Sequence, residues 1–194
     1  MKLHSSHDIS RRRVLLGSTT VLSASAVALL SGAPAWAAKN AAHHDPSRDA
    51  SVLNTALALE HEAINAYTLG AHSNLLEKPV LAVAVKFQDD HKAHRDRLIS
   101  VIKTLGGTPV QEKTLAAYAQ ELEANKLKSQ ADVLNFAAGL ERGAINAYLG
   151  IIPSFADRTI AKLAGQLAAD ETGHFIVLTQ SLGRALPAPL SFGV

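Results

Sequence analysis

The sequence of 194 residues contains no cysteine. Disulfide bonds, thiolate metal sites and cysteine nucleophiles are therefore excluded. Nine histidines and the carboxylates of Asp and Glu remain as the available metal ligands. Long low-complexity tracts are also absent, and the length suits one domain with a core of ordinary size.

A strong excess of charge of one sign is lacking as well. Residues 1–37 hold four of the 19 basic residues and one of the 17 acidic residues. The rest of the chain then has 15 basic and 16 acidic residues, which is a net charge of −1 with His neutral. The basic balance of the whole chain belongs to this first segment. Nothing in the remaining sequence favours binding to nucleic acid or to an anionic membrane surface.

Residues 1–37 are predicted to be an export signal peptide. The basic residues Arg11–Arg13 precede an apolar run from Val14 to Leu30, and residues 35–37 (Ala-Trp-Ala) form a small-residue cleavage site. Gly, Ser and Thr dilute the apolar run, so cleavage is favoured over a permanent anchor, which needs about 20 strongly apolar residues. Ser10 to Leu16 resembles a twin-arginine signal, which implies the twin-arginine export machinery as a partner and a periplasmic location.

The rest of the chain predicts an all-α fold. Residues 38–50 are expected to be a flexible lead, with the first helix beginning at Pro46 or at Ser51. Apolar side chains that recur with the 3.6-residue period predict four long helices, near residues 51–70, 79–105, 130–151 and 156–182. One long crossover with a short helical piece at residues 114–124 joins the second helix to the third. The bundle is expected to span residues 51–183, and residues 184–194 form a short tail.

An internal repeat relates the first pair of helices to the second. Residues 59–67 (LEHEAINAY) align with 140–148 (LERGAINAY), and residues 90–94 (DHKAH) align with 170–174 (DETGH). Each pair of helices is therefore predicted to be one half of the bundle. The alignment selects Glu60, and not Glu62, as the counterpart of Glu141, and it pairs His91 with Glu171.

Six ionisable side chains interrupt the apolar faces of the predicted helices. They are Glu60, His91, His94, Glu141, Glu171 and His174. Residues three apart share one face of a helix, so Glu171 and His174 direct a carboxylate and an imidazole toward the same point. Burying several such groups without a countercharge costs several kcal/mol per ion, so a bound cation is favoured over a metal-free polar core.

These residues resemble the ferritin-like superfamily, and in particular exported bacterial ferritin-like domain proteins, from about Ser51 to Leu182. The resemblance implies a four-helix bundle with one long crossover, in which two helices supply a Glu and two supply Glu-x-x-His to hold two metal ions. Carried over by position, this assigns as ligands Glu60, Glu141, Glu171, His174 and His94, with His91 at the sixth place. The Glu residues of the two Glu-x-x-His pairs usually bridge the metals, so Glu171 is expected to bridge and His91 to bind terminally or not at all.

Asp90 and Asp170 occupy equivalent places in the repeat. Both are interpreted as acceptors that orient the ligand imidazoles. An alternative is that Asp90 restores the missing carboxylate, since it shares a helix face with His94. Two divalent ions are implied, with iron as the first choice, while the additional imidazoles also suit Mn, Zn or Cu.

Tyr67 and Tyr148 each lie two turns, roughly 10 Å, beyond the Glu of their own helix. Packing in the amphipathic core is favoured for them over a role in electron transfer.

Two functions follow from these residues and the resemblance. The first is a ferroxidase-like oxidoreductase centre that reacts with O₂ or peroxide, for example by oxidising Fe²⁺. The second is a non-enzymatic metal-binding or stress-protective bundle with a degenerate site, which His91 favours because one bridging carboxylate is lost. The sequence leaves open whether the chain forms a homo-oligomer.

Overall fold

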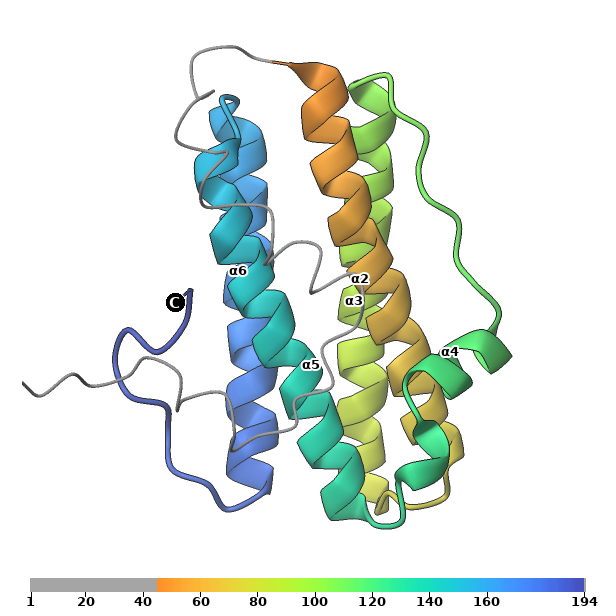
Figure 1. The fold of residues 1–194 in the computed structure, drawn as a ribbon. Helices are drawn as coiled ribbons and strands as arrows, with labels where there is room; N and C mark the ends of the chain where they lie inside the picture. The colour runs from red at the N-terminus through yellow and green to blue at the C-terminus, as the bar shows by residue number, and fades with distance from the viewer. Residues whose placement is uncertain (1–44, 194) are drawn as a thin grey trace, which may run out of the picture.

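The computed structural model describes residues 45–193, so the predicted signal peptide and residues 38–44 lie outside the described residues. Figure 1 shows helices joined by turns and loops. The elements are α2 (Pro46–His72), α3 (Lys78–Thr104), α4 (Leu115–Glu121), η1 (Ala124–Lys126), α5 (Gln130–Ile151), η2 (Ile152–Ser154) and α6 (Arg158–Ser181). No strand occurs between residues 45 and 193, which confirms the all-α prediction. None of these helices is long and apolar enough to cross a membrane.

α2 begins at Pro46, the earlier of the two predicted starts, so residues 46–50 belong to the helix and not to the flexible lead. The side chain of Asp45 caps the helix by accepting hydrogen bonds from the N–H groups of Ser47 and Arg48. Pro46 suits the first helical position because its fixed φ is already helical. Ala50 is buried against the core, so this first turn is part of the bundle.

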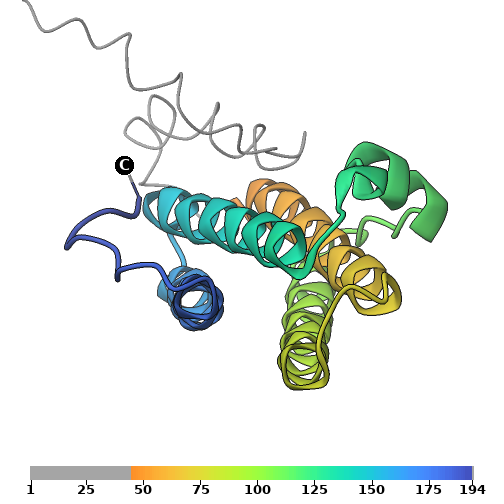
Figure 2. The same ribbon diagram turned by 90° about the horizontal axis from the view of Figure 1, so that it is seen from below.

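The four long helices form two antiparallel pairs (Figure 1). α2 packs along α3, and α5 packs along α6. The end-on view in Figure 2 shows α2 and α5 side by side, and this contact joins the two pairs. The pairs are the two halves that the internal repeat predicts.

The crossover from α3 to α5 lies against the outer side of α2. The side-chain amide of Asn54 donates to the carbonyl of Thr108 at 2.9 Å and accepts from the N–H of Val110 at 2.7 Å. At the preceding turn, a Cβ on Gly107 would lie 2.7 Å from the Cβ of Ala50. Glycine therefore permits the close approach between the end of α3 and the start of α2.

Two apolar clusters fill the bundle, one on each side of a polar layer. Leu53, Leu98 and Leu163 belong to the first cluster, and Phe87 and Phe175 belong to the second. On α2, α3 and α6 the predicted polar residues lie between the segments that form these clusters, whereas on α5 Glu141 lies between Ala138 and Ile145 of the second cluster. The polar layer is consequently closed off at both ends by packed apolar side chains.

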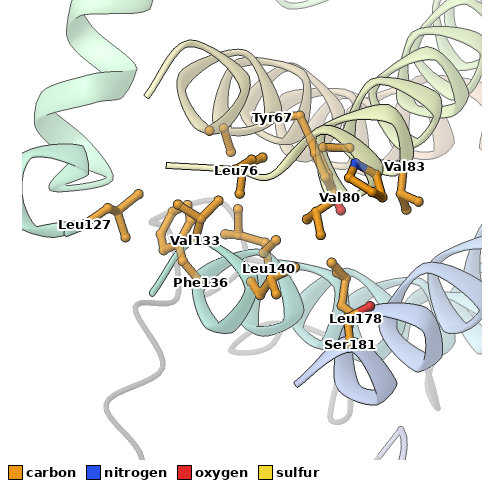
Figure 3. Close-up of a pocket in the computed structure, with 16 residues that line it drawn as sticks. Tyr67, Leu76, Val80, Val83, Leu127, Val133, Phe136, Leu140, Leu178 and Ser181 are labelled. Atoms are coloured by element: carbon orange, nitrogen blue, oxygen red, sulfur yellow. The ribbon is translucent and has the colours of Figure 1, made fainter. Parts of the chain in front are cut away.

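An apolar pocket of about 200 Å³ lies at the end of the bundle where α3 and α5 begin (Figure 3). Its lining includes Val80, Val83, Leu134 and Leu178, with the ring of Tyr67 on the wall nearest the polar layer. Ser181 and Tyr67 supply the only side-chain hydroxyls among its lining residues. The pocket therefore suits an uncharged apolar molecule better than an ion.

Candidate metal centre

The polar layer brings all six predicted side chains together at the middle of the bundle. They are Glu60 from α2, His91 and His94 from α3, Glu141 from α5, and Glu171 and His174 from α6. Each is at most 8% exposed. Since charged groups are rarely buried without a partner, the layer requires either internal pairing or a bound cation.

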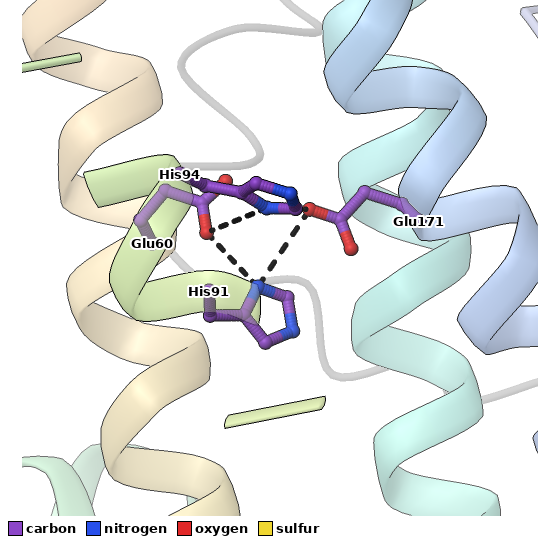
Figure 4. Close-up of side chains that lie close together, drawn as sticks. All are labelled: Glu60, His91, His94 and Glu171. Carbon is purple, nitrogen blue, oxygen red and sulfur yellow. Dashed lines mark hydrogen bonds and ion pairs between the residues drawn. The ribbon is translucent and has the colours of Figure 1, made fainter. Parts of the chain in front are cut away.

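Four of these residues form a first group of donors, drawn in Figure 4. Nδ1 of His91 lies 2.9 Å from Oε2 of Glu60, and Nδ1 of His94 lies 3.6 Å from the same oxygen. Nδ1 of His94 also lies 3.2 Å from Oε1 of Glu171, which reaches across from the other half of the bundle. One ligand atom from each of the four lies within 4.8 Å of the others.

A second group of four lies beside the first. Nε2 of His91 is 3.3 Å from Oε1 of Glu141. Nδ1 of His174 is 3.1 Å from Oε2 of Glu171 and 3.6 Å from Oε1 of Glu141. The two groups share two residues, His91 and Glu171, which occupy the same place in the repeat. The geometry thus supports two adjacent ion positions with two residues common to both.

Asp90 and Asp170 lie beside the outer ring nitrogens of two of these histidines. Nε2 of His94 is 3.3 Å from Oδ2 of Asp170, and Nε2 of His174 is 3.4 Å from Oδ2 of Asp90. Each aspartate therefore faces a histidine of the opposite half. A carboxylate on the outer nitrogen fixes the ring orientation and leaves Nδ1 facing the centre, as is common around metal-binding histidines.

Tyr67 and Tyr148 contact the centre in a crossed arrangement that the sequence pattern does not predict. The hydroxyl of Tyr67 on α2 donates to Oε1 of Glu141 on α5, and the hydroxyl of Tyr148 on α5 donates to Oε1 of Glu60 on α2. Both rings are buried, as predicted for core packing. The distance of each tyrosine from the Glu of its own helix does not predict this contact, because each tyrosine bonds to the Glu of the neighbouring helix. The symmetry of the repeat could have suggested that the two helices contact each other in this reciprocal way.

In the metal-free protein, imidazolium groups supply the countercharge. Burial alone lowers the pKa of His94 and of His174, but the adjoining carboxylates outweigh it and raise these pKa values to about 10 and about 9. Burial likewise raises the pKa of Glu60, while its contacts with His91 and His94 lower it to about 2. The protonated imidazole rings thus place positive charge beside the buried carboxylates.

Glu171 remains poorly compensated in this arrangement. Burial, followed by the negative charge of Glu141, raises the pKa of Glu171 to about 7. Within the described residues, Oε2 of Glu141 has no hydrogen-bond partner, and Oε1 of Glu171 and Nδ1 of His94 have only their 3.2 Å contact with each other. An unsatisfied buried atom costs about 1–3 kcal/mol. A cation between these atoms would remove that cost, so the donor set fits a metal ion.

A family model described as a ferritin-like domain matches residues 48–184. This range covers the four long helices, apart from the first two residues of α2, and the whole polar layer. Comparison with curated proteins and with solved structures finds no match.

Proposed function

Because the chain belongs to the ferritin-like domain family, we propose that its buried centre holds two divalent metal ions and oxidises Fe²⁺ with O₂ or peroxide. The observation that carries this proposal is the pair of four-donor groups that share His91 and Glu171. Iron is the metal we propose, and a donor set of carboxylates and imidazoles also accepts Mn, Zn or Cu.

The first ion would take donors from Glu60, His91, His94 and Glu171. The second would take donors from His91, Glu141, Glu171 and His174. When bound there, two Fe²⁺ ions would supply the electrons for reduction of the oxidant. Asp90 and Asp170 hold the imidazoles of His174 and His94 in orientation, and the two tyrosines hold one oxygen of each terminal carboxylate.

The apolar pocket supports O₂ as an oxidant. Its lining suits a small uncharged molecule, and Tyr67 connects its inner wall to the centre through the hydrogen bond to Glu141. Apolar clusters on both sides of the polar layer keep bulk water away from the donors. Electrostatic interactions between the donors and a cation are stronger in such a water-poor environment.

We also propose that the protein acts in the periplasm after export by the twin-arginine machinery. The support is the sequence of residues 1–37, with its consecutive arginines, diluted apolar run and small-residue cleavage site. Export in the folded state by this route would allow metal loading before export.

A second candidate function is non-enzymatic metal binding that protects against metal stress. His91 favours this function, because it replaces one of the two carboxylates that bridge the ions in the family pattern. Such a change of bridge would alter the electronic coupling between two bound ions, while the remaining donors would still be able to hold them.

Aerobic addition of Fe²⁺ to metal-free protein distinguishes the two functions. Oxidation is followed by the absorbance of the Fe³⁺ product, with protein-free buffer and the Glu171→Gln variant measured in parallel. We expect multiple turnovers in the parent and a rate near that of buffer in the variant. Glu121→Gln, which changes an exposed carboxylate outside the centre, is the matched control and should retain the parent rate. Stoichiometric binding without turnover would support the non-enzymatic function.

A further inference from the structure

His91 occupies the position between the two groups of donors. Its ring is buried to 1% exposure, and its two nitrogens face different carboxylates. Nδ1 lies 2.9 Å from Glu60 and 3.6 Å from Glu171, whereas Nε2 lies 3.3 Å from Glu141. In Figure 4 the second ring nitrogen of His91 points away from the first group of donors. If His91 were a ligand of one ion only, one of its ring nitrogens near a group of donors would be enough, whereas both nitrogens lie near carboxylates.

The surrounding rings hold His91 in this orientation. Its ring centroid lies 5.3 Å from that of Tyr67 and 5.3 Å from that of His174, and 5.7 Å from that of His94. Tyr67 is itself fixed by its hydrogen bond to Glu141. Rotation of the His91 ring within this packed layer would separate a nitrogen from its carboxylate, so the two-sided placement is built into the fold.

Charge gives a second and independent reason to assign His91 to both ions. Two divalent ions carry four positive charges, and the six donors include only three carboxylates, those of Glu60, Glu141 and Glu171. One negative charge is therefore missing among the buried donors, because Asp90 and Asp170, which face the outer nitrogens of His174 and His94, are partly exposed to solvent. A histidine that gives a lone pair to each of two ions must lose its remaining N–H proton, and the resulting imidazolate carries one negative charge.

We propose that His91 bridges the two metal ions as an imidazolate, with Nδ1 bound to one ion and Nε2 to the other, opposite the bridge formed by Glu171. This inference rests on the proposed two-ion centre. The balance is complete, because neutral imidazole releases one proton to solvent and forms two metal–nitrogen bonds. The four positive charges of the ions are then matched by three carboxylates and one imidazolate, with no change in oxidation state.

Loading with Cu²⁺ alone tests the bridge, since each ion carries one unpaired electron. Copper content per chain and the intensity of the electron paramagnetic resonance signal per copper are measured on the parent, His91→Ala and Glu171→Gln. We expect two copper ions per parent chain and loss of most of the signal, because exchange through the ring pairs the spins. A Glu171→Gln protein that binds two copper ions should still lose most of the signal, whereas His91→Ala should give more signal per copper than the parent, because exchange through the ring is lost.

The variant His91→Glu keeps the test valid if His91→Ala fails to fold. It restores the carboxylate of the family pattern, so X-ray absorption should find the ions about 3.5–4 Å apart, as in other two-metal sites. The parent should show a longer separation, because the two nitrogen lone pairs of an imidazolate diverge, whereas a bridging carboxylate can direct a lone pair of each oxygen toward neighbouring ions.

The possible results distinguish a failure of the proposed imidazolate bridge from a failure of the proposed two-ion centre. A parent that binds no more than one ion of any divalent metal would overturn the proposed two-ion function. A parent that binds two copper ions with the full signal, or with the same separation as His91→Glu, would overturn the imidazolate bridge and leave the two-ion centre standing.

Discussion

Removal of the metal ions is expected to lower the melting temperature of the protein by about 10–20 °C. An ion that binds only the folded chain adds about 2.7 kcal/mol when free metal is 100 times its dissociation constant. The centre has two groups of four donors, so two ions add about 5 kcal/mol. A domain of this size shifts by about 2–4 °C per kcal/mol, which gives the stated range.

The buried donor atoms contribute to the same free energy. Oε2 of Glu141 has no hydrogen-bond partner among the described residues, while Nδ1 of His94 and Oε1 of Glu171 lie 3.2 Å apart as an ion pair. An unsatisfied buried atom costs about 1–3 kcal/mol, so a cation that satisfies Glu141 removes a cost of that size.

Differential scanning calorimetry of chelator-treated and metal-replete protein at one pH measures the difference. Glu171→Gln is the matched variant, because it removes the carboxylate shared by both groups while nearly preserving its shape. The variant should lose most of the metal-dependent increase. Equal melting temperatures for the chelated and replete parent would refute the reasoning, and the polar layer would then be a metal-free core in which imidazolium groups balance the carboxylates.

Three further predictions concern pH, hydrogen bonding and export. In the folded protein the pKa values of His94 and His174 are raised from 6.5 to about 10 and about 9. Protonation of these rings therefore stabilises the metal-free protein, fully below about pH 6.5, and this stabilisation is lost as the pH rises through 9–10. Metal binding strengthens as protons leave the ligands, so the difference in melting temperature between replete and chelated protein should widen from pH 6 to pH 9; a constant difference in calorimetry would contradict this. Tyr148→Phe removes a buried hydrogen bond to a carboxylate and should lower the stability of the metal-free protein by about 1.5–3 kcal/mol in chemical denaturation, whereas an unchanged midpoint would show that the bond adds nothing. Replacing Arg12 and Arg13 with Lys should prevent accumulation of processed protein outside the cytoplasm, and normal accumulation in a fractionation assay would point to a Sec-type signal.

The helices were predictable from the sequence because their end signals are local. α5 runs from Gln130 to Ile151 as predicted, since Ser129 caps its start through a hydrogen bond to the N–H of Asp132 and Pro153 follows its end. The start of the bundle was less clear, because two starting points were consistent with the pattern. Asp45 decides between them through its capping bonds, which depend on backbone geometry that the residue pattern does not specify.

Contacts between helices were harder to predict than contacts along one helix. The spacing of Glu171 and His174 fixes a shared face, and the structure places both in the polar layer. Which histidine faces Asp90, or which carboxylate accepts from Tyr67, depends on the rotation of one helix relative to the next. A single sequence contains that information only indirectly, through the symmetry of its repeat.

The sharing of His91 and Glu171 has a consequence for how the two halves of the bundle are joined. The α2–α3 hairpin supplies three donors to the first group and His91 to the second, while the α5–α6 hairpin supplies three donors to the second group and Glu171 to the first. Neither hairpin can complete a four-donor group alone. If the peptide chain were cut within the crossover, bound ions would link the two pieces in addition to the apolar clusters that both hairpins share, and a chelator would weaken their association.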